Sequence, residues 1–287
     1  MLICRLITYF FHYIEILINY DIIINGEMFM KKKLLIAFKL IGETFLFWVF
    51  WFFAVVGMAS CIENMIIQEE VKDFINSAEF VSENGAYVYY AVYTDELIEP
   101  TITFDEYNVP NLGYTGDIFL MPKSNMDMLP FTAQFIGFYF GGHAGIVGYD
   151  EKRLTNEAVE ALGGASDETF IDYDLFSDVL RPEKRNVIGM RVKAPLADRE
   201  KAWEYAKTLN GKPYNYLFIV DNKDKYYCTD LCARVYGKEA GLDYNLEWNG
   251  FATSTQDIAL SKDTYISYIK IMKDDKYYIY YLANRGE

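Results

Sequence analysis

Two residues of this chain have side chains that could carry out nucleophilic chemistry, His143 and Cys228. The chain holds 2 histidines and 4 cysteines in 287 residues, so a metal site built from several histidines is excluded. His143 follows Gly141 and Gly142 and begins an apolar run that predicts a buried strand. Small neighbours leave space for another backbone or a substrate beside the imidazole. A structural histidine in the core is the alternative.

Cys228 is expected at the start of a helix, because apolar residues such as Leu231 and Val235 follow it at helical spacing. Backbone N–H groups at a helix N-terminus carry about half a positive charge and favour a thiolate. A buried structural cysteine is the alternative. Cys232 is expected in the core, since a helix does not orient these two sulfurs for a disulfide. With His143 they form too small a set for zinc, so we expect neither a metal nor a cofactor.

The pattern of elements around these residues predicts an α+β domain with a mostly antiparallel sheet packed on helices. Strands are expected at 86–93, 117–121, 144–149, 157–161, 186–193, 265–272 and 276–282. Helices are expected at 62–80, 198–209 and 228–240, and a loop at 108–115. The predicted organisation is a membrane segment at 1–60, a connector helix and strand at 61–110, and a larger α+β domain at 111–287.

The apolar segment 34–60 is long enough to cross a hydrocarbon layer of roughly 30 Å. Lys39 and Glu43 lie one helical turn apart near one end, where they can pair. Lysines at 31–33 predict a cytoplasmic start and an exported carboxy-terminal side. The domain is therefore expected at the membrane of a bacterial cell envelope, outside the cytoplasm.

Alternatives to a retained span remain open at both ends of this segment. It could be a cleaved signal peptide, and the residues before Cys61 resemble a lipoprotein box in which that cysteine would be lipidated. The apolar stretch 2–25, which contains His12, is either a second span or precedes a true start at Met28 or Met30.

The charge balance excludes a nucleic-acid binder. There are 41 acidic against 27 basic residues, a net charge of -14, and the whole acidic excess lies after residue 61. Binding to nucleic acid depends on basic side chains that neutralise phosphates. The expected partners are the membrane and a peptide or cell-wall substrate.

Several motifs follow one another in an informative order. GDIFL begins at Gly116, and it is followed by GGHAGIVG, VEALGG, GKPYNYLF and YYCTDLCARVY. Together they resemble the permuted papain-fold amidases, the YiiX/YaeF-type branch of the NlpC-like cysteine hydrolases. The resemblance covers roughly Gly113 to the carboxy terminus and implies a permuted papain-like fold, in which the histidine precedes the cysteine.

The resemblance implies that Cys228 is the nucleophile and His143 its base. Val-Glu-Ala at 159–161 matches the family's third position, so Glu160 is expected to orient the imidazole. Glu157 is the fallback, and it would point to the opposite face of the strand.

The implied reaction is acyl transfer through a thioester. The backbone N–H of Cys228 is a natural oxyanion donor. Tyr214, Tyr227 and Gly142 are the candidate substrate-binding residues, with core packing the alternative for each tyrosine. Amide bonds, among them those of cell-wall peptides, are the expected target. A lipid esterase or acyltransferase, or an inactive binding module with the same fold, is the alternative.

Overall fold

The computed structural model describes residues 27–104, 108–121, 142–150, 155–164, 167–173, 186–218, 222–246 and 253–285. By its internal contacts the chain divides into two compact units, Met1–Ala59 and Ser60–Glu287. The stretch 2–25, with its expected second span and His12, lies outside the described residues.

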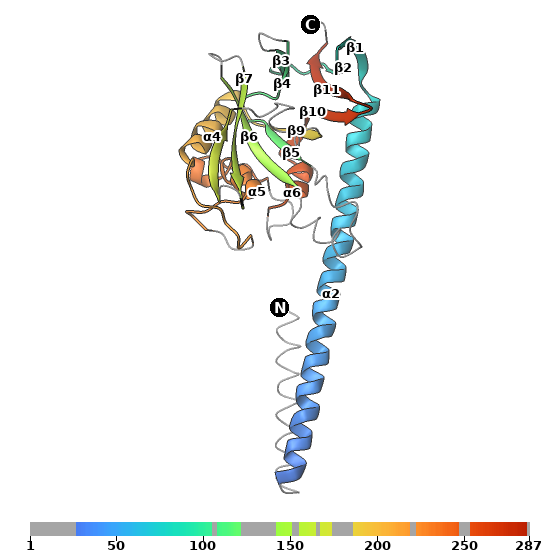
Figure 1. Ribbon diagram of the computed structural model, residues 1–287, viewed down its shortest axis with the longest axis vertical. Helices are drawn as coiled ribbons and strands as arrows, with labels where there is room; N and C mark the ends of the chain where they lie inside the picture. The colour runs from blue at the N-terminus through green and yellow to red at the C-terminus, as the bar shows by residue number, and fades with distance from the viewer. Residues whose placement is uncertain are drawn as a thin grey trace. The chain divides into compact units, whose positions relative to one another are not determined.

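Helix α2 (Glu27–Asn76) carries the apolar segment (Figure 1). In the part of the chain that the structure describes, it is the one helix that is long and apolar enough to cross a membrane, judged by length and composition. Lys39 and Glu43 form the expected ion pair, with 3.8 Å between Nζ and Oε1. The sequence predicted a separate helix at 62–80, but α2 continues without a break and ends at Asn76.

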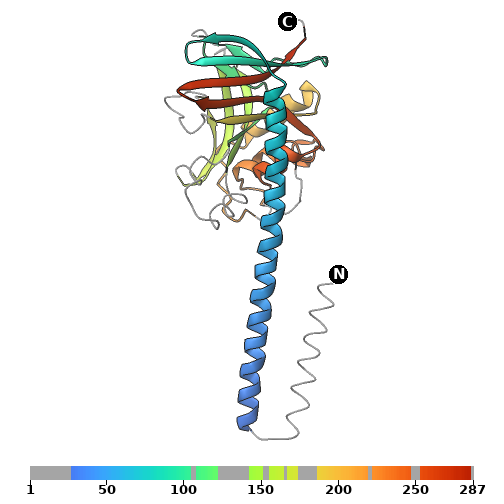
Figure 2. The same cartoon turned by 90° about the vertical axis from the view of Figure 1, so that its right-hand side faces the viewer.

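A nine-stranded sheet forms the centre of the second unit, in the order β1-β2-β11-β10-β9-β5-β6-β7-β8. Its strands are β1 (Glu79–Asn84), β2 (Tyr87–Thr94), β5 (Ile118–Met121), β6 (His143–Asp150), β7 (Thr155–Leu162), β8 (Glu168–Asp172), β9 (Val187–Val192), β10 (Thr264–Lys273) and β11 (Lys276–Asn284). Every neighbouring pair is antiparallel except β2 and β11, so the predicted mostly antiparallel sheet is confirmed. The sheet twists strongly, and β2, β10 and β11 run across the direction of β6 and β7 (Figures 1 and 2).

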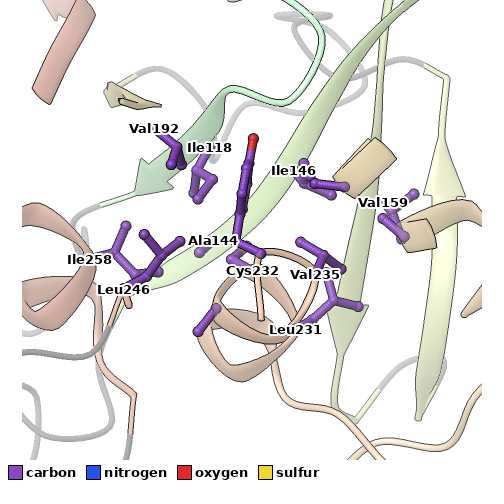
Figure 3. Packing of buried hydrophobic residues seen from close by; sticks show 14 of the residues in the cluster. Ile118, Ala144, Ile146, Val159, Val192, Leu231, Cys232, Val235, Leu246 and Ile258 are labelled. Carbon is purple, nitrogen blue, oxygen red and sulfur yellow. The ribbon is translucent and has the colours of Figure 1, made fainter. Parts of the chain in front are cut away.

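Helices α4 (Leu196–Thr208), α5 (Cys228–Arg234) and α6 (Thr255–Leu260) contribute to the main core with one face of this sheet. Figure 3 shows Cys232 of α5 and Val235, the residue that follows this helix, beside Ala144 and Ile146 of β6. The prediction that Cys232 lies in the core is confirmed. Val147, the neighbour of Ile146, belongs to a second core cluster, because successive side chains of a strand point to opposite faces.

A buried ion network joins the residue just before β5, strand β9, helix α4 and the segment that precedes β3 (Ile102–Phe104). The carboxylate of Asp117 accepts two hydrogen bonds from Arg191, at 2.7 and 2.8 Å. Arg191 and Arg199 both reach the Glu99 carboxylate, with 3.7 and 2.6 Å between nitrogen and oxygen. Asp117 and both arginines are almost fully buried, so each charge is stabilised by its ion-pair partners in place of water.

Some predicted boundaries were wrong. The loop expected at 108–115 contains β4 (Pro110–Leu112), which pairs with β3 in a separate two-stranded sheet, where a proline at the first strand position is tolerated. The helix expected at 228–240 ends at Arg234 and is followed by the 3₁₀ helix Lys238–Ala240. Strands β1, β3 and β8 and helix α6 were not anticipated.

Candidate active site

Cys228 is the first residue of α5, and His143 is the first residue of β6. Tyr227 has an extended backbone and precedes the helix, and its carbonyl accepts the Leu231 N–H at 2.9 Å. The Cys228 side chain forms a hydrogen bond with His143, and its sulfur also accepts the backbone N–H groups of Ala144 and Thr229. The structure therefore brings Cys228 and His143 together, and their roles as nucleophile and base stay predictions.

Gly142 gives the backbone just before His143 a conformation that favours glycine. Its φ is +90°, a conformation that residues with a Cβ rarely adopt. A Cβ at this position would lie 2.8 Å from the Met121 carbonyl oxygen and 3.1 Å from Thr255 Cγ2. The structure thus gives Gly142 a backbone role, and its contact with a substrate stays a prediction.

Glu160 reaches His143 across two antiparallel strands. Gly145 lies directly opposite Glu160 in the β6–β7 register. His143, two residues before Gly145 on the same strand, is therefore the diagonal neighbour of Glu160. A Cβ on Gly145 would lie 2.8 Å from Glu160 Cγ and 2.5 Å from Phe119 Cε1. Because Gly145 has no side chain, Glu160 has room to place Oε2 2.5 Å from Nε2 of His143. This contact leaves Nδ1 for the sulfur.

The fallback carboxylate, Glu157, lies elsewhere. It pairs in register with Gly148, and it is three residues from Glu160, so its side chain points to the opposite face of β7. Of the two candidates it is Glu160 that contacts the imidazole.

The environment favours the charged forms of both His143 and Cys228. Burial opposes protonation of His143, but hydrogen bonds with Cys228 and Glu160 and their charges outweigh it and raise the His143 pKa to about 10. Burial likewise opposes ionisation of Cys228, but the hydrogen bond and charge of His143 and two backbone N–H groups lower its pKa. In contrast, burial raises the pKa of Cys232 well above its ordinary value. One turn of helix separates a thiolate-forming cysteine from an inert one.

Thr253, which the sequence analysis did not identify, forms hydrogen bonds with the start of α5. Thr229 Oγ1 donates to the Thr253 carbonyl at 2.6 Å, and the Thr253 N–H donates to the Tyr227 hydroxyl at 2.9 Å. Thr253 lies just before α6 and carries no sequence signal of this role. Further along α5, the Asp230 carboxylate pairs with Arg234 at 3.3 Å.

The two candidate tyrosines differ in their surroundings. Tyr227 is buried, and its hydroxyl accepts the Thr253 N–H. Tyr214 is partly exposed. Partial burial raises the pKa of its hydroxyl most, and the negative charge of the nearby Cys228 thiolate raises it further. Among the described residues, no group of three or more His, Cys, Asp or Glu side chains is arranged to hold a metal ion.

Comparison with known protein families agrees with this arrangement. Residues 115–248 match the permuted papain-like amidase enzymes of the YaeF/YiiX, C92 family. The resemblance inferred from the motifs is thereby confirmed, and this amidase family is one of cysteine-peptidase-type hydrolases. The matched stretch contains His143, Glu160 and Cys228 in the permuted order.

The match to the permuted papain-like amidases ends before α6, β10 and β11. Thr253, which holds the start of α5, therefore lies outside it. No curated protein and no solved structure matches the chain.

Proposed function

We propose that this protein is a membrane-tethered cysteine hydrolase that cleaves amide bonds outside the cytoplasm, with Cys228 as nucleophile, His143 as acid and base, and Glu160 as the residue that orients His143. The observation that carries the proposal is the hydrogen-bonded series Glu160–His143–Cys228. An acidic residue, an imidazole and a thiol in this order form a catalytic triad by geometry and role. The match to an amidase family supports the same reaction.

The first half of the reaction forms a thioester. The Cys228 thiolate attacks the amide carbon, and the carbonyl electron pair moves to oxygen. The backbone N–H of Cys228, at the first position of α5, is the proposed donor to this oxyanion. The imidazolium of His143 then gives its proton to the departing nitrogen, the C–N bond breaks, and the amine leaves.

The second half regenerates the enzyme. Neutral His143 accepts a proton from water as the water oxygen attacks the thioester carbon. The C–S bond breaks, a carboxylic acid leaves, and the thiolate and imidazolium are restored. Glu160 holds the ring in one orientation and stabilises its positive charge in both halves, from an Oε2–Nε2 distance of 2.5 Å.

The proposed substrates are peptides of the cell envelope. Support comes from the apolar helix α2, which would hold the domain at a membrane, and from the three lysines that precede the apolar segment. Lipid esters would be accessible from the same place, so the two substrate classes have to be separated by experiment.

The thiolate is tested first, by the rate at which iodoacetamide alkylates Cys228 between pH 5 and 10, followed by peptide mapping. We expect fast alkylation well below pH 7 and loss of this acid reactivity in His143→Ala. Free cysteine, whose thiol has a pKa of about 8.5, serves as the reference. Alkylation of Cys228 that follows an ordinary thiol profile would favour the inactive binding module.

The substrate class is tested by incubating purified full-length protein with peptidoglycan and, separately, with phospholipid vesicles. Release of peptide or amine products by the wild type, with none from Cys228→Ala and full release by Cys61→Ala, supports the amidase. Turnover of phospholipid alone would replace it with the lipid hydrolase.

A further inference from the structure

We propose that Tyr216 and Leu217 form a substrate subsite that binds an apolar group next to the scissile carbonyl. This inference rests on the proposed nucleophile and goes further, because it states what kind of group the enzyme accepts beside the bond that it cleaves. Both residues lie in the segment Pro213–Phe218, named here the aromatic loop.

The aromatic loop is attached to the backbone just before the nucleophile. Tyr214 and Tyr226 form a parallel bridge, in which the Asn215 N–H donates to the Tyr226 carbonyl at 3.0 Å. The Tyr226 N–H donates to the Pro213 carbonyl at 3.1 Å. Tyr226 is two residues before Cys228, so these hydrogen bonds attach the loop to the backbone close to the nucleophile, and the thiolate charge of Cys228 acts on Tyr214 of the loop.

Ring contacts lead from the surface of the loop to the start of α5. Tyr216 packs edge-on against Tyr214, with 4.9 Å between ring centroids. Tyr214 contacts Phe218 at 6.2 Å, and Phe218 contacts Tyr227 at 5.4 Å. Tyr227 adjoins Cys228 in the chain, so a series of ring contacts leads from the outer ring to the residue next to the nucleophile.

The outer end of this surface is apolar and exposed. Tyr216 is 56% exposed and Leu217 is 62% exposed. The six residues of the loop carry no charged side chain, in a chain of which 24% is charged. Among the described residues, the Asp167 carboxylate contacts Tyr216 and would repel an anionic group. An uncharged apolar group therefore gains most from this surface, because it buries the ring face and the leucine together.

The exposed ring of Tyr216 is held in place. Its hydroxyl donates to the Asp167 carboxylate and accepts the Gly164 N–H at 2.9 Å. The Gly164 N–H also donates to Asp167 at 2.7 Å. The hydroxyl is thus used for positioning, and the ring face is left for contact. A surface that is fixed before binding loses less conformational entropy when a ligand arrives.

The strand that orients the imidazole also makes room for the loop. Gly163 and Gly164 follow β7, which carries Glu160. A Cβ on Gly163 would lie 2.9 Å from Tyr214 Cε1, so the glycine lets this ring pack against the end of the strand. The VEALGG motif therefore supports both the triad and the proposed subsite.

Backbone strain in the loop points to the same role. Phe218 has φ +32°, outside the ordinary regions for a bulky residue. Such strain costs energy and is retained mainly at ligand and active sites. Here it accompanies the placement of the Phe218 ring between Tyr214 and Tyr227.

The test compares alkylation of Cys228 by N-hexyl iodoacetamide with alkylation by iodoacetamide, in full-length protein at one pH. The rate ratio cancels changes in the thiol pKa, because both reagents meet the same thiolate. We expect the ratio to exceed that of free cysteine by about tenfold, the effect of burying roughly two methylene groups.

The Leu217→Ala and Tyr216→Ala variants should each lower this ratio severalfold toward the value for free cysteine. Leu217 is exposed, so its replacement does not threaten the fold. Tyr173→Ala is the matched control, since Tyr173 is 49% exposed just after β8 and belongs to no part of the loop. Its ratio should equal that of the wild type.

A wild-type ratio equal to that of free cysteine would overturn the subsite, and so would a raised ratio that both loop variants leave unchanged. The proposed nucleophile fails in a different way, through an ordinary pH profile of iodoacetamide alkylation alone. The two failures are therefore distinguishable.

Discussion

Glu160→Gln tests the coupling between the triad members most directly, because it removes the carboxylate charge but keeps the size of the side chain. Glu160 Oε2 lies 2.5 Å from His143 Nε2, and the Glu160 side chain is only 3% exposed. An opposite charge at such range shifts a pKa by roughly 1 to 3 units. The His143 pKa, about 10 in the wild type, should fall by about that amount, equivalent to ~1.4–4 kcal/mol of lost imidazolium stabilisation.

The sign of the effect follows from the direction of the shift. The raised pKa means that folding favours the imidazolium, so its contribution to stability is full below about pH 6.5 and is lost as the pH rises through about 10. Without the carboxylate, this loss should begin at a lower pH. The thiolate of Cys228 loses part of its partner at the same time, so acid reactivity toward iodoacetamide should decrease.

Proton NMR titration of the imidazole provides the assay, because the chain has only 2 histidines and His143→Ala assigns the signal. Glu157→Gln is the matched control, the same substitution on the opposite face of β7. The reasoning is refuted if the wild-type His143 signal titrates near 6.5, or if Glu160→Gln and Glu157→Gln titrate alike.

Other predictions concern stability and pH dependence. Asp117→Ala leaves Arg191 buried without its main partner, so it should lower the free energy of unfolding by ~3–5 kcal/mol. Denaturant unfolding of the variant and the wild type measures this loss, and a loss below about 1 kcal/mol would contradict the buried network. Gly145→Ala places a Cβ 2.8 Å from Glu160 Cγ, so it should lower the free energy of unfolding by ~1–3 kcal/mol and displace the Glu160 carboxylate. The His143 pKa in the NMR titration should then fall. An unchanged titration would show that the contact between Glu160 and the ring does not depend on the missing side chain of Gly145. The alkylation rate of wild-type Cys228 should stay nearly level from below pH 7 until the imidazolium loses its proton near pH 10, and a steady rise through pH 8–9 would contradict the ion pair.

Segments on both sides of the family match make contacts with the matched stretch. Glu99 precedes the matched stretch and completes the charge network of Arg191 and Arg199. Thr253 follows it and binds both Thr229 and Tyr227 at the start of α5. The matched segment holds the triad, while Thr253 stabilises the start of α5, which carries Cys228, and Glu99 stabilises β9 and α4.

The sequence alone was sufficient for what depends on local pattern. Two scarce side chains, His143 and Cys228, identified the candidate chemistry, and the helical spacing after Cys228 predicted its place at the start of a helix. Alternation and apolar runs predicted most strands, including β6 and β7, to within a few residues. The resemblance in motif order predicted that the histidine and the cysteine would meet.

Tertiary structure decided what depends on register and packing. The choice between Glu160 and Glu157 follows from the pairing of Gly145 with Glu160, because a shift of one residue would turn every side chain of β7 to the other face. The contacts of Thr253 join it to residues near position 228 that are distant in sequence, and no local sequence pattern predicts them. Such long-range contacts form only when several elements pack together, so periodicity within one segment cannot contain them.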